Sequence, residues 1–133
     1  MLALLLLSSC SLAVPAWPDA PTVECQAASC PTDDDARTAL ALAADISPEL
    51  DPAPPLVIAW TEPEALAPDV SFTTDERHVF VASWAGFFHE RWHAHFFSTG
   101  DHGDGNHSAP PGPWTDETFA VIEEAKNAWQ GAQ

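Results

Sequence analysis

Positive charge is scarce in this chain. Lys and Arg make up only 4 of its 133 residues, against 20 Asp and Glu, so the formal net charge is -16 at pH 7. A surface with this balance repels phosphate groups, and we expect neither nucleic acid nor anionic lipid headgroups as partners. The same charge attracts cations, divalent metal ions included, and it also suits the solubility of an exported protein.

Long apolar runs and phosphate-binding motifs are also missing. The apolar run from Leu2 to Leu7 is far shorter than the roughly 20 residues that a membrane-spanning helix needs. A short apolar segment followed by small residues is typical of an export signal. The sequence contains no internal repeat and no glycine-rich loop of the kind that cradles a phosphate.

The residues that follow this run read Leu-Ser-Ser-Cys and end at Cys10. This order resembles the lipobox of bacterial lipoproteins. The resemblance implies that residues 1–9 are a signal peptide, that Cys10 is lipidated, and that the lipid anchors the protein to a membrane. Ser11 then implies an outer-membrane lipoprotein of the bacterial cell envelope. Ordinary signal cleavage after Ala16 is the alternative, and both routes predict export.

The remaining cysteines agree with export. Cys25 and Cys30 form an even pair, and in an oxidising compartment we expect them to be joined by a disulfide. Metal ligation by this pair is disfavoured, because the spacing differs from that of zinc sites and no second pair exists. Residues 10–33 are rich in proline, alanine and small polar residues, which is typical of a linker that carries a domain away from a membrane.

The rest of the chain predicts a small single α+β domain over residues 34–133. Acidic residues before an Ala- and Leu-rich segment predict a helix, and apolar or alternating segments predict strands. Thr115 is placed to cap a last helix. The expected elements are a helix over 36–44, a buried strand over 56–60, a hairpin over 70–73 and 78–82, a central helix over 84–97 and a final helix over 116–130.

The central segment carries the candidate site. If it is helical, its large aromatic residues recur at steps of three and four and form one buried stripe. His89 and His93 then project from neighbouring turns, with Glu90 between them. In this H-E-x-x-H arrangement two imidazoles hold a zinc ion and the glutamate acts on a water molecule. The stripe consists of Trp84, Phe87, Phe88, Trp92 and Phe96.

A zinc hydrolase needs three protein ligands, one open position and a base. The sequence supplies two ligands and the base, and it leaves the third ligand open. The candidates lie in the loop after Gly100 and on the final helix: His102, His107, Glu117, Glu123 and Glu124.

The order of elements around the H-E-x-x-H helix resembles a minimal zincin metallopeptidase of the gluzincin kind. The resemblance implies a zinc cofactor, a peptide or protein substrate, Glu90 as catalytic base, and His89 and His93 as ligands. It also implies that the third ligand is a glutamate on the following helix. A metzincin resemblance is weaker, because Phe96 and Thr99 stand where that family has glycine and a third histidine.

Two other interpretations remain open. In the first, residues 89–97 form a strand, and His93 and His95 make an H-x-H pair that resembles the one in cupin-type metal barrels and binds copper or zinc without catalysis. In the second, the histidines and aromatic residues pack in a core or a recognition surface and bind no metal. The function we expect is therefore an exported zinc-dependent hydrolase, and the alternative is a non-catalytic metal-binding or interaction lipoprotein.

Overall fold

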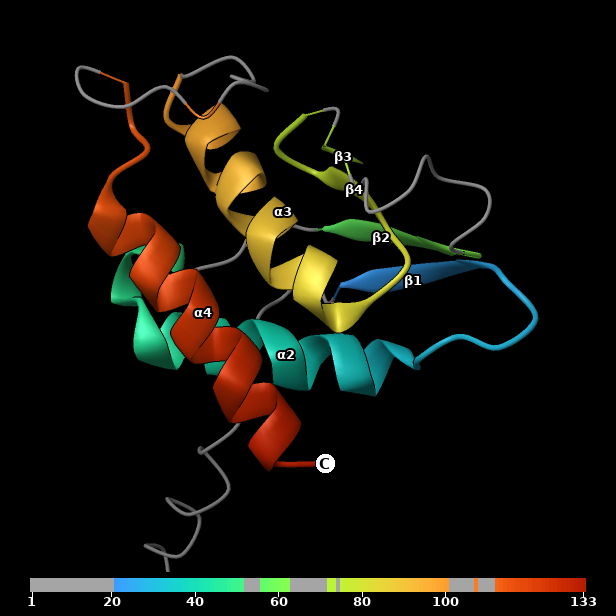
Figure 1. Cartoon of the computed structure of the whole chain (residues 1–133). Coiled ribbons are helices and arrows are strands. Elements are labelled where there is room, and N and C mark those ends of the chain that lie inside the picture. Colours follow the sequence, from blue (N-terminus) through green and yellow to red (C-terminus); the bar gives the residue numbers. More distant parts are fainter. Residues whose placement is uncertain (1–20, 52–55, 63–71, 74, 101–106, 108–111) are drawn as a thin grey trace, which may run out of the picture.

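The computed structural model describes residues 21–51, 56–62, 72–73, 75–100, 107 and 112–133 (Figure 1). These residues form a small α+β domain, as predicted. Its elements are β1 (Thr22–Gln26), α2 (Asp33–Ile46), the 3-10 helix η2 (Pro48–Leu50), β2 (Val57–Thr61), β3 (Phe72–Thr73), β4 (His78–Val81), α3 (Trp84–Ser98) and α4 (Asp116–Gly131). The predicted signal peptide and Cys10 lie outside the described residues.

The strands form one sheet in the order β1-β2-β4-β3. β1, β2 and β4 run parallel, and β3 pairs antiparallel with β4, as the predicted hairpin requires. Ile58 lies opposite Val79 in the register, and both side chains are fully buried. Along β4 the exposed side chain of His78 is followed by the buried side chain of Val79. One face of this strand therefore packs against the core.

β1 corrects the expected domain boundary, because it lies inside the segment 10–33 that composition had suggested to be linker. Thr22 to Gln26 pair with β2 along their whole length. β1 is an edge strand whose residues are mostly exposed, and Val23 is its one residue packed against the hydrophobic core. An edge strand of this kind shows no apolar alternation in the sequence. The backbone amide of Val23 donates to Asp33 Oδ1 at 2.8 Å, which ties the strand to the start of α2.

Helix α2 begins where its acidic residues predict. Thr32 is the N-cap, and it forms a capping box with Asp35, whose carboxylate accepts from the Thr32 backbone amide at 2.9 Å. The helix ends at Ser47, and Pro48 opens the 3-10 helix that follows. The buried residues of α2 are small apart from Leu40, so a second helix can pack close to its surface.

Helix α3 carries the predicted aromatic stripe. Ser83 caps its N-terminus by accepting a hydrogen bond from the Gly86 backbone amide. Just past its C-terminus, Gly100 adopts a φ of 97°, in the left-handed region where glycine commonly ends helices. Because residues 89–97 are helical, the alternative strand with an H-x-H pair does not form.

The domain has three layers (Figure 1). Helices α2 and α3 lie on one side of the sheet, and α4 packs against both of them. Helices α3 and α4 run antiparallel, since Trp114 before α4 contacts His93 while Trp129 near its end contacts Trp84. Among the residues that the structure describes, no helix is long and apolar enough to cross a membrane.

Candidate metal centre

Three histidine side chains converge between α3 and α4. His89 and His93 project from neighbouring turns of α3, and His107 comes from the segment that precedes α4. Their Nε2 atoms lie 2.8 Å (His89 to His107), 3.0 Å (His93 to His107) and 3.3 Å (His89 to His93) apart. This histidine triad can hold a metal ion.

Hydrogen bonds alone cannot satisfy the triad. The Nε2 atom of a neutral imidazole either donates or accepts, so among three such atoms at least two have the same role. One of the three short contacts must then join two donors or two acceptors, which repel each other. A metal ion accepts a lone pair from all three nitrogens at once. In a tetrahedral site with Zn–N bonds of about 2.0–2.1 Å the nitrogens lie about 3.3–3.4 Å apart. His89 and His93 have this spacing, at 3.3 Å, whereas His107 lies closer to both, at 2.8 and 3.0 Å.

An aromatic wall lies behind the triad. The indole of Trp114 is 2% exposed, and its centroid lies 5.4, 4.6 and 4.6 Å from those of His89, His93 and His107. Phe119 continues the wall, with its centroid 5.2 Å from that of Trp114. The three histidines are therefore held by packing against side chains that would not compete for a metal ion.

This environment keeps His89 in the form that binds metal. Burial lowers its pKa from 6.5 to about 4, and the nearby charges of His107 and Lys126 act in the same direction, whereas Glu123 opposes them. At neutral pH the His89 imidazole is therefore neutral, as a metal ligand must be.

The backbone at His107 shows how this ligand reaches the other two. Its φ is 54°, in the left-handed region that few residues other than glycine adopt. Histidine is among the side chains more often found there, and such a conformation persists only where the surroundings hold it. Here the contacts with Trp114 and Phe119 hold the ring in place.

Glu90 is buried on the side of α3 that faces β3. Its side chain is 4% exposed, and the hydroxyl of Thr73 donates to Glu90 Oε2 at 2.6 Å. Burial raises the pKa of Glu90 to about 7, although the hydrogen bond from Thr73 lowers it in part. A carboxyl group that titrates near neutral pH can both take up and release a proton there.

The other predicted third ligands do not join the triad. Glu117, Glu123 and Glu124 are exposed on α4, and Glu123 accepts a hydrogen bond from Lys126 Nζ at 2.7 Å. His102 lies outside the described residues. The residue that the structure brings to His89 and His93 is thus a histidine from the loop, whereas the gluzincin resemblance implies a glutamate from the last helix.

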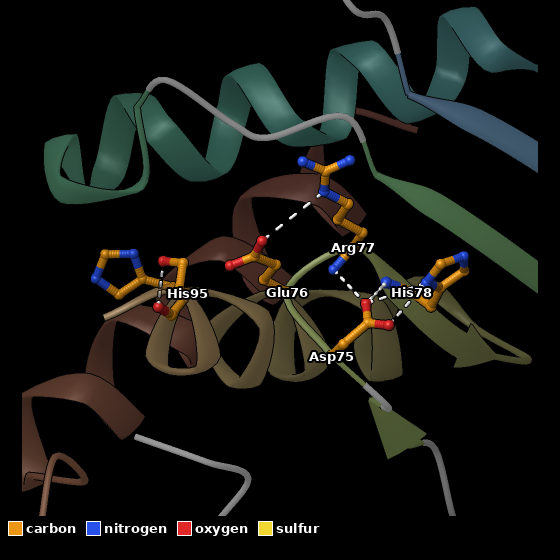
Figure 2. Close-up of polar contacts among 6 residues, drawn as sticks. Asp75, Glu76, Arg77, His78 and His95 are labelled. Atoms are coloured by element: carbon orange, nitrogen blue, oxygen red, sulfur yellow. Dashed lines mark hydrogen bonds and ion pairs between the residues drawn. The ribbon is translucent and has the colours of Figure 1, made fainter. Parts of the chain in front are cut away.

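Two further histidines lie elsewhere. Figure 2 shows His78, the first residue of β4, beside Asp75 in the turn that precedes it. The Nδ1 atom of His78 lies 3.0 Å from the Asp75 carboxylate. This carboxylate also accepts hydrogen bonds from the backbone amides of Arg77 and His78. Partial burial acts to raise the pKa of Asp75, but these hydrogen bonds and the charge of His78 outweigh it and lower the pKa. His95 lies 3.8 Å from Glu49.

Sequence reasoning missed the role of Trp114. It stands one residue before the N-cap Thr115, and it stacks on Phe119 in the next turn. This is the hydrophobic staple that often sets the direction in which a chain enters a helix. An aromatic residue before a capping threonine, with a second aromatic five positions after the first, is the signal that would have revealed it.

Sequence reasoning also missed how deeply Arg91 is buried. Its side chain is 2% exposed, and Nη2 donates to the carbonyl oxygen of Leu50 at 2.8 Å, while Nη1 has no partner among the described residues. Burial lowers the pKa of Arg91 to about 10. The contact fixes α3 to η2, one residue away from Glu90.

No protein-family description, curated protein or solved structure matches this chain. The triad is therefore interpreted from its own geometry, as a group that could hold a metal ion.

Proposed function

We propose that this protein is a zinc-dependent hydrolase that acts on peptides or proteins. The observation that carries the proposal is the triad itself, whose three Nε2 atoms lie 2.8–3.3 Å apart, with Glu90 directly after the first ligand. Three neutral imidazoles favour zinc among the common biological metals that lack redox chemistry. Three protein ligands also leave the fourth tetrahedral position free, as catalytic zinc sites do.

Each residue then has a distinct role. His89, His93 and His107 would hold the ion. When bound, zinc supplies a Lewis acid that polarises a carbonyl group and makes a water molecule more acidic. Glu90, with its pKa near 7, would take a proton from the attacking water and pass it to the leaving amine. Thr73 fixes the direction of the Glu90 carboxylate through its hydrogen bond.

The second candidate is a non-catalytic metal-binding protein. One contact favours it: the hydroxyl of Thr73 holds the Glu90 carboxylate against β3, as it would a carboxylate with a structural role. The two candidates make the same prediction for metal content and differ only in turnover. Hydrolysis by the wild-type protein therefore distinguishes them, and Glu90 tests the mechanism of the first.

The test combines metal analysis with peptide hydrolysis. We expect about one equivalent of zinc per chain after dialysis, in the wild type and in Glu90→Gln, and much less in His93→Ala. Hydrolysis of a mixed peptide library should fall by at least about 100-fold in Glu90→Gln. His78→Ala, in an exposed histidine outside the triad, is the control for both measurements. No hydrolysis by the wild-type protein would leave the non-catalytic candidate, and unchanged hydrolysis in Glu90→Gln would overturn the role of Glu90 as the base.

We further propose that the protein is exported and anchored to the cell envelope through a lipid on Cys10. The disulfide that joins Cys25 and Cys30, with an S–S distance of 2.06 Å, supports an oxidising compartment. Expression of the full chain in a bacterium should place it in the membrane fraction. Cys10→Ala should release it into the soluble fraction, and a variant that stays bound to the membrane would contradict the anchor.

A further inference from the structure

A second unexplained group of side chains lies at the other end of the α3–α4 pair. Trp60 of β2, Trp84 at the start of α3 and Trp129 near the end of α4 come together there, with ring centroids 4.9 Å (Trp60 to Trp84) and 4.8 Å (Trp84 to Trp129) apart. They line a pocket of about 530 Å³, which we call the tryptophan pocket. Its volume lies within the range of small-molecule sites, about 300–1,000 Å³.

The neighbouring tryptophan rings contact one another at an angle. Their planes are tilted by 56° (Trp60 and Trp84) and 48° (Trp84 and Trp129), so they do not stack face to face. Each of the three side chains is only partly buried, unlike Trp114, which packs fully in the core. Part of each tryptophan side chain is therefore exposed and available to a ligand.

The polar side of the pocket is negative. Asp35 and Thr38 of α2 line it. Asp35 is exposed, and its Oδ2 accepts a hydrogen bond from the backbone amide of Thr32, the N-cap of α2. Among the described residues that line the pocket there is no Lys or Arg. The net charge of the chain, -16, adds an attractive field for any cation that approaches.

The disulfide holds one edge of the pocket in place. Cys25 lies opposite Trp60 in the β1–β2 register, and it is bonded to Cys30, which lines the pocket. The sulfur of Cys30 lies 4.0 Å from the carbonyl oxygen of Trp60. The cross-link thus ties β1, beside Trp60, to a residue that lines the pocket.

We propose that the tryptophan pocket binds a quaternary ammonium group. Such a cation is attracted by the faces of aromatic rings, most strongly by tryptophan, and a carboxylate beside the rings adds a direct charge interaction. A trimethylammonium group is also weakly hydrated, whereas a primary ammonium loses more solvation on entering an aromatic site. The occupant is either a free choline-like molecule or a trimethylated lysine side chain, which share this chemistry.

The proposal does not depend on the zinc hydrolase. The triad packs on Trp114 before α4, while the tryptophan pocket is built around Trp129 near its end. Removal of metal with a chelator should leave ligand binding in the pocket unchanged. Failure of the zinc proposal and failure of this one are therefore separate results.

The test is a titration of the full chain with choline at constant ionic strength, followed by calorimetry and tryptophan fluorescence. The matched probe is 3,3-dimethylbutan-1-ol, which has the same shape without the charge. We expect saturable choline binding that is about tenfold tighter than that of the neutral probe. Equal binding of the two probes, or no saturation by about 50 mM choline, would overturn the proposal.

Two variants locate the binding in the pocket. Trp129→Leu should weaken choline binding about tenfold, and Asp35→Asn, which keeps an oxygen for the helix cap, should weaken it about threefold. Asp45→Asn, on an exposed residue of the same helix outside the lining, should have no effect. If Trp129→Leu does not fold, the difference between the two aspartate variants decides the question, and equal affinities in these two would overturn the proposal.

A second titration uses a short peptide that contains trimethyl-lysine. If it binds more tightly than choline, the ligand is a modified protein side chain, and if choline binds more tightly, it is a free small molecule. Both results require that unmodified lysine in the same peptide bind at least about tenfold more weakly than trimethyl-lysine, since charge alone would otherwise explain the attraction.

Discussion

The two ends of the α3–α4 pair use the same kind of side chain for different purposes. At one end Trp114 is fully packed and covers three histidines, and at the other Trp60, Trp84 and Trp129 stay partly exposed around a pocket. The difference lies in the polar groups that accompany the rings. Neutral imidazoles offer lone pairs to a metal ion, whereas a carboxylate beside ring faces offers charge to an organic cation.

The largest expected difference between the two ends is in stability. Trp114→Ala should lower the free energy of unfolding of the metal-free protein by about 3–5 kcal/mol, because it opens a cavity in the core. Trp129→Ala should cost about half as much, since that side chain is already partly exposed. Urea unfolding in the presence of a chelator measures both. Equal losses would mean that the two tryptophans are packed alike.

The second largest effect is expected when one histidine of the triad is removed. His107→Ala should weaken zinc binding at least about 100-fold, because two histidines on one helix cannot complete the site. Competition with a chromogenic chelator measures the affinity, and His95→Ala, on the same helix as two of the ligands but outside the triad, is the control. Wild-type affinity in His107→Ala would show that another residue completes the site. Choline binding should be the same in all three proteins.

The buried carboxyl group at the triad end should make stability depend on pH. The pKa of Glu90 is raised from 4.5 to about 7, so the folded state binds its proton more tightly than the unfolded state does. Little stability is lost at pH 4, where most molecules are protonated in both states, and the loss grows as the pH rises to 7 and is complete above it. Glu90→Gln should therefore stabilise the metal-free protein by roughly 2–3 kcal/mol at pH 8.

The measurement is urea unfolding at pH 4 and pH 8 with a chelator present. Glu76→Gln, on a half-exposed glutamate in the β3–β4 turn, is the matched control and should behave as the wild type at both pH values. A stabilisation of Glu90→Gln that is equal at pH 4 and pH 8 would show that it does not arise from the charge.

The smallest expected effect concerns the helix cap that supports the tryptophan pocket. Thr32→Ala removes the hydrogen bond that the Thr32 hydroxyl accepts from the backbone amide of Asp35 and should destabilise the domain by about 1 kcal/mol. The backbone amide of residue 32 still donates to Asp35 Oδ2, so choline binding and zinc affinity should both stay close to their wild-type values. Thr115→Ala removes the side-chain cap of α4, next to Trp114. It should weaken zinc binding more than choline binding. If either variant affected both sites equally, the two ends would not be independent.

The sequence predicted the elements with strong local signals. The cap Thr115 predicted the start of α4, and the aromatic stripe favoured the helix that α3 forms, although a strand over residues 89–97 remained open. β1 was missed, because a strand at the edge of the sheet buries little and so leaves no periodic pattern.

The third ligand of the site could be narrowed down but not chosen. His89 and His93 follow from helical spacing alone, since residues four apart lie on one face. The choice of His107 depends on a loop conformation with positive φ and on the packing of Trp114 against Phe119. Such contacts join segments far apart along the chain, and no local pattern encodes them.

Edge strand β1 also bears on how copies of this protein meet each other. The outer rim of an edge strand presents unpaired backbone groups that can template pairing with another chain. Here the carboxylate of Asp33 occupies the amide of Val23, and the exposed Glu24 adds a charge to the same strand. The residue that begins α2 thus also protects the sheet from edge-to-edge aggregation.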